Sequence, residues 1–314
     1  MNEKPLCTVI LPTIGRPKFF GPALASVAAQ TYRPLNILIS DNAANPPIEL
    51  AEIQKWAPQA NVRLVRRSSR LAGPNHFNLC LNEVDSEYVF LMADDDMIAP
   101  GYVSAGMECI LSDSSVGMVT ALQTAVDESF FGPVSDAPIK CKALPGSEFA
   151  VGLFDGDNPG VWNISAMLVR RRQVLECGGF CDYPTGSFSD YTLFFQLCLG
   201  AKLGLLDGGY YYRVYPTSEG LAAPWRELLM ALSCYERDLL DLHTKGRLGK
   251  KFLLLIIRGN TRLLFSRWKQ LYRCRPGFGN KVRPLFDMAW RTLAVGWRYG
   301  LGAEPKLYKY IGVE

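Results

Sequence analysis

The chain has 314 residues, of which 48% are hydrophobic and 20% charged, a composition that fits a packed globular protein and excludes a disordered one. Its net charge is +4, but 16 basic and three acidic residues give residues 245–314 a balance of +13, which leaves −9 for residues 1–244. We therefore expect two regions that meet different partners. The strongest apolar run, residues 252–257, is far shorter than the roughly 20 residues that span a bilayer, so no transmembrane helix is predicted.

Cysteine and histidine usage bears on the compartment. The nine cysteines are scattered without a CxxC pair and there are two histidines, so no structural zinc site is predicted. The cysteines are interpreted as small buried apolar residues in a reducing cytosol. The N-terminal residues show no apolar leader with a cleavage site, and we expect a cytoplasmic protein.

Short β-branched runs alternate with helical spacing along the first 121 residues. Strands are predicted at residues 7–11, 36–40, 62–65, 88–92 and 116–121, and helices at residues 20–30, 75–82 and 102–111. This alternation predicts an α/β protein with a mostly parallel, Rossmann-like sheet flanked by helices.

The second half of the chain is less regular. Residues 122–159 are rich in Gly, Pro and Asp and are interpreted as a long irregular stretch with substrate contacts. The pattern then resumes with a strand predicted at residues 164–169 and helices at residues 172–176 and 190–199. Helical spacing dominates beyond Pro224, so we predict a domain of residues 1–220 followed by a helical, basic region of residues 221–314.

Three consecutive carboxylates, Asp94, Asp95 and Asp96, follow the apolar run at residues 88–92. We call them the carboxylate triplet. Ligands bind at the carboxyl ends of strands in open α/β sheets, and adjacent carboxylates repel one another. A divalent cation, Mn²⁺ or Mg²⁺, would offset that repulsion and bridge phosphate oxygens. The alternative is a solvated acidic turn that caps the next helix.

Polar residues also follow the first two predicted strands. Thr13 and Arg16 come after the first strand and Asp41 after the second, so all should lie on the same edge of the sheet as the carboxylate triplet. Asp41 could accept the ring N–H of a uracil or thymine, and Arg16 could contact phosphate. For Asp41 the alternative is an Asx turn. His76, between apolar residues, is interpreted as a core or interface histidine rather than a ligand.

Taken in order, these segments resemble a family 2 glycosyltransferase of the inverting, GT-A-fold kind that builds bacterial surface polysaccharides. The resemblance runs from Thr8 to about Ser218. It is carried by an ordered set of segments: VILPTIGRP, ISDN, GPNHFN, LMADDDMIAP, SAMLVRR, GGF, Asp190 and YYR at the end of a late strand.

The resemblance implies a role for several residues. The nucleotide would be bound by Thr13, Arg16, Asp41, Asn75 and Asp94. The metal-binding DXD-type pair would be Asp94 and Asp96, with Asp95 as the alternative ligand because the family register places the first acid on Ala93.

Asp190 matches the general base, which takes a proton from the attacking sugar hydroxyl, although its usual acidic predecessor is Ser189 here. A helix N-terminal Asp is the alternative interpretation. Trp162 and Asn163 are candidate acceptor contacts, with a buried Trp as the alternative. Tyr215 stands where the family often places a His.

The expected function is transfer of a hexose or deoxyhexose from a nucleoside-diphosphate sugar to a glycan or lipid-linked acceptor. The basic, Trp-rich C-terminal region suits an anionic membrane surface, so we expect a peripheral protein at the inner face of the cell membrane and no nucleic-acid partner. A solvated helical bundle is the alternative for that region. The rival functions are a nucleotidyltransferase, which should carry a Gly-rich phosphate loop with a Lys, and a catalytically silent glycan-binding or scaffold protein.

Overall fold

The computed structural model describes residues 3–132, 134–149, 165–214 and 224–250, together with residues 253, 256, 257, 259 and 260. The chain divides into two compact units, residues 1–249 and 250–314. Trp162, Asn163, Tyr215 and most of the basic C-terminal region lie outside the described residues, and the account below concerns the first unit.

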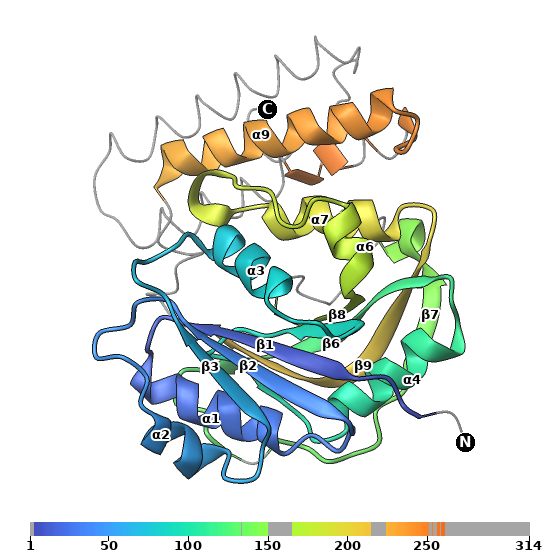
Figure 1. Ribbon diagram of the computed structural model, residues 1–314. Coiled ribbons are helices and arrows are strands. Elements are labelled where there is room, and N and C mark those ends of the chain that lie inside the picture. Colours follow the sequence, from blue (N-terminus) through green and yellow to red (C-terminus); the bar gives the residue numbers. More distant parts are fainter. Residues whose placement is uncertain are drawn as a thin grey trace, which may run out of the picture. The chain divides into compact units, whose positions relative to one another are not determined.

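In the described residues the first unit is built on one nine-stranded sheet (Figure 1). Its order is β3 (Val62–Arg66), β2 (Leu35–Asp41), β1 (Cys7–Thr13), β4 (Tyr88–Leu91), β8 (Met167–Arg170), β6 (Val116–Asp127), β9 (Lys202–Val214) and β5 (Met97–Ile98), with β7 (Cys141–Pro145) also paired to β9. The strands from β3 to β4 are parallel, and β8 is antiparallel to both of its neighbours. The mostly parallel α/β sheet predicted from the sequence is confirmed.

Helices cover both faces of this sheet. The helices of the first unit are α1 (Pro17–Ala28), α2 (Leu50–Trp56), α3 (Gly73–Asn82), α4 (Tyr102–Ser112), α6 (Arg171–Glu176), α7 (Ser189–Cys198) and α9 (Trp225–Thr244), with a short 3₁₀ turn, η1 (Pro184–Gly186). Figure 1 shows α1, α2 and α4 on one face and α3, α6 and α7 on the other. Because both faces are covered, the central strands β1 and β4 are almost wholly buried and read as continuous apolar runs.

Helix α1 shows how local sequence sets the packing. Pro17 stands at the first helical position, where its missing N–H has no intrahelical partner to lose. Phe20 and Leu24 are fully buried in the same apolar cluster as Val9 of β1. Gly21 lies so close to α2 that an added Cβ would be 2.4 Å from the Trp56 ring, so glycine is what permits this approach.

The predicted irregular stretch is partly ordered as sheet, which corrects the prediction. Strand β6 continues to Asp127, and β7 forms at Cys141–Pro145. β6 and β7 pair with opposite edges of β9. Most side chains of these segments are exposed or half-exposed, which leaves only a weak hydrophobic pattern, and backbone pairing with β9 supplies the order.

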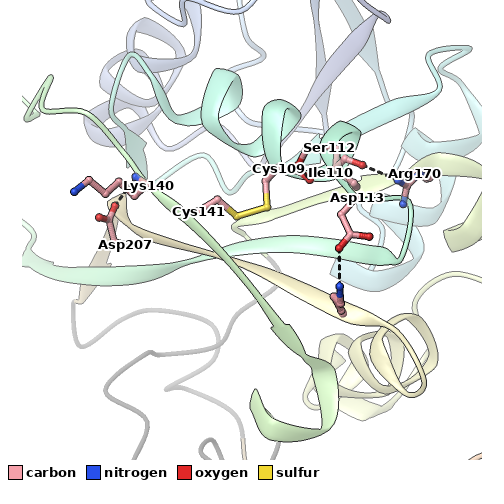
Figure 2. The surroundings of a disulfide bond; sticks show 9 residues. Cys109, Ile110, Ser112, Asp113, Lys140, Cys141, Arg170 and Asp207 are labelled. Atoms are coloured by element: carbon pink, nitrogen blue, oxygen red, sulfur yellow. Dashed lines mark hydrogen bonds and ion pairs between the residues drawn. A yellow bond between two sulfur atoms is a disulfide. The ribbon is translucent and has the colours of Figure 1, made fainter.

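Two cysteines also differ from expectation. Cys109 of α4 and Cys141 of β7 form a disulfide, with their Cα atoms 6.1 Å apart (Figure 2). The interpretation of the cysteines as unpaired apolar residues is therefore wrong for this pair. It is confirmed for Cys7, Cys80 and Cys198, which are buried and free.

Helix α9 belongs to the first unit. Its apolar side chains, among them Leu228, Leu232 and Leu239, are buried, and the helix packs on α7 and η1. The compact unit that contains α9 ends at Gly249, and the domain division predicted at residue 220 stays a prediction. Among the described residues, no helix has both the length and the apolar character needed to cross a bilayer.

Candidate active site

The ends of three neighbouring strands bring Thr13, Asp41 and Asp94 of the predicted nucleotide-binding residues to one edge of the sheet. Thr13 of β1 pairs directly with Asp41 of β2. β1 also pairs with β4 through Ile10 and Leu91, so Asp94 follows Leu91 at the same spacing as Thr13 follows Ile10. The Thr13 hydroxyl accordingly donates to Asp94 Oδ2 at 2.6 Å. The expectation that these strand ends share an edge is confirmed.

Asp94 is the buried centre of this edge. Its Oδ2 also accepts the Ile14 N–H at 3.3 Å, and its Oδ1 lies 2.7 Å from Arg16 Nη1. Burial raises the pKa of Asp94 to about 6, against the opposing effect of the Arg16 charge. The same Arg16 nitrogen lies 2.9 Å from Asp95 Oδ2. One guanidinium nitrogen thus bridges two carboxylates of the triplet.

Asp96 faces a different part of the sheet. Its Oδ2 accepts the Tyr210 hydroxyl at 2.7 Å and its Oδ1 accepts the Arg213 N–H at 3.0 Å, both from β9. Burial, followed by the charge of Asp95, raises the pKa of Asp96 to about 8. Within the described part of the chain, no group of three or more His, Cys, Asp or Glu side chains is arranged to hold a metal ion. Direct metal ligation by the triplet stays a prediction.

Arg213 is a site residue that the sequence marked only as a strand end. Its guanidinium carbon lies 4.9 Å from the centre of the Phe19 ring and 4.8 Å from that of Phe131. Its Nε donates to the Asp95 carbonyl at 2.8 Å, and its Nη1 donates to the Phe130 carbonyl. The sequence places Arg213 directly after three tyrosines in an apolar strand. That position could have indicated a site residue, because a buried guanidinium needs carbonyl and ring partners.

Asp41 holds the turn that follows β2. Its Oδ1 accepts the Ala44 N–H at 2.7 Å and its Oδ2 accepts the Ile48 N–H at 3.0 Å. Gly15, with φ of +73°, packs against this turn, where an added Cβ would lie 2.5 Å from Ala44 Cβ. Asp41 thus binds the backbone of the loop after β2 through bonds to the third and seventh residues on, whereas an Asx turn would bond the second. Its contact with a nucleobase stays a prediction.

His76 is part of a buried polar network beneath that edge. Its Nε2 lies 2.7 Å from Ser40 Oγ, which also accepts Arg67 Nε at 3.0 Å. Arg67 in turn makes a two-pronged ion pair with Glu83, both contacts at 2.6 Å. Burial, with the nearby Arg67 charge, lowers the pKa of His76 to about 4, so the ring is neutral at physiological pH. The interpretation of His76 as a core histidine is confirmed.

Two sequence segments about 100 residues apart meet beside α3. The Asn78 side chain donates to the Phe180 carbonyl and accepts the Phe180 N–H, each at 2.8 Å. Asn75, predicted to bind nucleotide, donates to Asp182 Oδ2 at 2.9 Å. These contacts tie the N-terminal half of α3 to the segment that leads into α7 and Asp190.

Asp190 lies in the first turn of α7 and is half-buried. Its Oδ1 accepts the N–H of Tyr191 at 3.0 Å, and no cationic side chain of the described residues pairs with it. Burial raises its pKa to about 7. The preceding Phe188 has φ of +68° and stacks on Tyr235 of α9 with ring centres 5.3 Å apart. The carboxyl group is therefore poised to gain or lose a proton near neutral pH.

The mostly parallel sheet gathers an acidic triplet, an arginine and a threonine on the edge where open α/β sheets bind ligands. With the family match, this fold places the chain among the GT-A glycosyltransferases. The chain belongs to glycosyl transferase family 2, whose model matches residues 8–179. No curated protein sequence matches the chain.

Solved structures support the fold. TarS 1–349 from S. aureus in complex with UDP-GlcNAc is similar at a TM-score of 0.65 and 15% identity, over 90% of this chain and 80% of that one. The mannosyltransferase PcManGT from Pyrobaculum calidifontis, in complex with GDP-Man and Mn²⁺, is similar at a TM-score of 0.58 and 16% identity, over 96% of this chain and 82% of that one. Against a longer TarS chain the TM-score is 0.57 at 16% identity, and this protein spans 43% of that chain's length.

Proposed function

We propose that this protein transfers a hexose or deoxyhexose, with inversion, from a nucleoside-diphosphate sugar to a glycan or lipid-linked acceptor in cell-surface polysaccharide synthesis. The observation that carries the proposal is the shared edge at which Thr13, Arg16 and Asp94 make direct contact. Family membership supports sugar transfer. The complexes of similar structures with UDP-GlcNAc and with GDP-Man support a nucleotide-sugar donor.

The residues of the triplet suit a divalent cation. Asp94 and Asp95 already share one positively charged group, and carboxylate oxygens are the donors that Mg²⁺ and Mn²⁺ prefer. Asp94, Asp95 and Asp96 are the residues that would hold it. When bound, such a cation supplies charge stabilisation for the leaving diphosphate. Thr13, Arg16, Asp41, Asn75 and Asp94 would hold the nucleotide.

Asp190 is the proposed general base. Its pKa of about 7 and its lack of a cationic partner among the described residues leave it basic enough to take the proton of the acceptor hydroxyl. That hydroxyl oxygen attacks the anomeric carbon while the bond to the diphosphate breaks on the opposite face. A single in-line displacement therefore inverts the configuration. Trp162 and Asn163 are proposed to contact the acceptor, and the basic C-terminal region to place the enzyme at the inner membrane face.

A donor screen tests this function. The full chain is incubated with a panel of nucleotide sugars, Mn²⁺ and candidate acceptors, and released nucleoside diphosphate is measured with and without chelator. We expect release with one donor, loss of turnover in chelator, and an inverted anomeric centre by NMR. Transfer with retained configuration would contradict the mechanism. A protein that binds glycans but releases no nucleotide from any donor would support the catalytically silent alternative.

A further inference from the structure

Arg16 occupies the position between two carboxylates of the triplet. Its Nη1 lies 2.7 Å from Asp94 Oδ1 and 2.9 Å from Asp95 Oδ2. The Arg16 side chain is 22% exposed, whereas those of Asp94 and Asp95 are 4% and 14% exposed. The positive group is thus the part of this cluster that solvent, and a ligand arriving from solvent, reaches most easily.

A guanidinium and a divalent cation cannot both bridge these two oxygens. Mg²⁺ binds carboxylate oxygen at about 2.1 Å, and so needs the space in which the Arg16 nitrogen lies. A cation held by Asp94 Oδ1 and Asp95 Oδ2 would therefore have to displace the Arg16 nitrogen.

The carboxylates keep other supports when Arg16 leaves. Asp94 Oδ2 remains bonded to the Thr13 hydroxyl and the Ile14 N–H. Asp96 remains bonded to Tyr210 and to the backbone of Arg213. The acidic edge is held by β1 and β9, so Arg16 can move without collapse of the site.

We propose that Arg16 and the divalent cation exchange places when the donor binds, and that the displaced guanidinium then pairs with the donor diphosphate. The inference rests on the proposed function and deepens it. Without nucleotide, a cation bound at these two oxygens would break both ion pairs of Arg16 with the triplet. With nucleotide, the diphosphate would offer the displaced guanidinium a new anionic partner. Cation and donor therefore bind cooperatively through Arg16, and the coupling is reciprocal.

Binding measurements on the full chain test this exchange without any turnover. Mn²⁺ affinity is measured alone by electron paramagnetic resonance, and affinity for UDP and GDP is measured by calorimetry with saturating Mn²⁺. We expect Arg16→Gln to bind Mn²⁺ alone about tenfold more tightly than wild type, and to bind the nucleoside diphosphate about tenfold more weakly, within the range typical of coupled sites.

The opposite signs separate this role from simple damage, because a disrupted site loses affinity for both ligands. Lys18→Gln is the matched control: Lys18 is a neighbouring cation, half-exposed, and its ion-pair partner is Glu128 at 3.8 Å. It should change neither affinity. Arg16→Met, which keeps an unbranched stem without the charge, must show the same two signs as Arg16→Gln and replaces it if that variant fails to fold.

Arg16 variants that bind Mn²⁺ alone no more tightly than wild type, or that bind the nucleoside diphosphate as well as wild type, overturn the exchange and leave the proposed function standing. A wild-type protein that binds neither UDP nor GDP in the presence of Mn²⁺ overturns both.

Discussion

Asp190 is the residue whose charge state should set the pH response. We expect Asp190→Asn to keep donor affinity and to lose transfer about 10²- to 10⁴-fold, because only proton removal is lost. In wild type, kcat/KM should fall as the pH drops below the Asp190 pKa of about 7. Steady-state kinetics from pH 5.5 to 8.5, with calorimetric donor binding, measure both. Near-wild-type transfer by the variant would place the base elsewhere.

The same residue has a predicted effect on stability. The folded-state pKa of Asp190 is raised above the ordinary carboxyl value of 3.8, so the folded protein favours the protonated form and loses stability as the pH rises from about 4 to about 7. Asn is neutral at every pH and avoids that cost. Asp190→Asn should therefore raise the Tm at pH 8 and should change it less at pH 5, which thermal unfolding at the two pH values measures.

At pH 9, above its pKa of about 8, the Asp96 carboxylate accepts two hydrogen bonds from β9 that an amide cannot both receive, so its effect on stability is tested at that pH. In Asp96→Asn one of the donors, Tyr210 OH or Arg213 N–H, faces an NH₂ group. Because a buried donor without a partner costs about 1–3 kcal/mol, we expect a loss of that size in the free energy of unfolding. Urea unfolding of Asp96→Asn, Tyr210→Phe and the double variant measures it. If the hydrogen bond to Tyr210 is the one lost, the double variant is less destabilised than the sum of the singles.

At the scale of elements, two neighbouring glycines lie where the segment after α6 meets α3. Substituting each of them allows the cost of backbone strain to be measured apart from the cost of steric overlap. Gly178 and Gly179 have φ of +84° and +73°. An added Cβ at Gly178 meets nothing within 4 Å, whereas at Gly179 it would lie 2.3 Å from Asn78 Oδ1. Gly178→Ala should cost about 1–2 kcal/mol in unfolding free energy and Gly179→Ala clearly more. If the two variants lose the same unfolding free energy in denaturant, the Asn78 side chain can move away from the added methyl group without an energetic cost.

The link between α4 and β7 makes a covalent prediction. Cys109 and Cys141, 32 residues apart in sequence, should resist alkylation until reductant is added, whereas the half-buried free thiols of Cys177, Cys181 and Cys234 should react without it. Closing a loop of this length stabilises a protein by about 3–4 kcal/mol in the chain-entropy model, so reductant should also lower the Tm. Mass spectrometry of alkylated peptides gives the pairing. Alkylation of both cysteines in unreduced protein isolated under acid quench would contradict it.

For the whole molecule, the uneven charge predicts attraction to anionic membranes. Residues 245–314 carry a balance of +13, and each basic residue near such a surface contributes about 1 kcal/mol, screened beyond about 8 Å at physiological salt. The full chain should co-sediment with anionic vesicles at low salt and less at high salt. A chain ending at Gly249, the limit of the first compact unit, should not bind them. If the two chains co-sediment equally with neutral and with anionic vesicles, the proposed membrane role is wrong.

Local patterns were sufficient to predict the parallel strands and the edge at which their polar residues lie. Strand and helix periodicities placed β1, β2 and β4 correctly, and parallel strands end on the same side, so Thr13 and Asp94 were expected at one edge. Their direct contact depends on β1 lying next to β4, which only the structure shows. The core position of His76 followed similarly from its apolar neighbours.

Tertiary structure decided the features that depend on residues far apart in the chain. Asp94 and Asp96 are two positions apart, yet one bonds Thr13 and the other Tyr210, because strands on opposite sides of the triplet supply their donors. The Cys109–Cys141 pair and the pairing of β7 likewise rest on partners that no local pattern encodes. Sequence by itself therefore determined which groups gather at the edge of the sheet. The fold decided which way each of these side chains points, because their hydrogen-bond partners belong to strands that meet only in the folded protein.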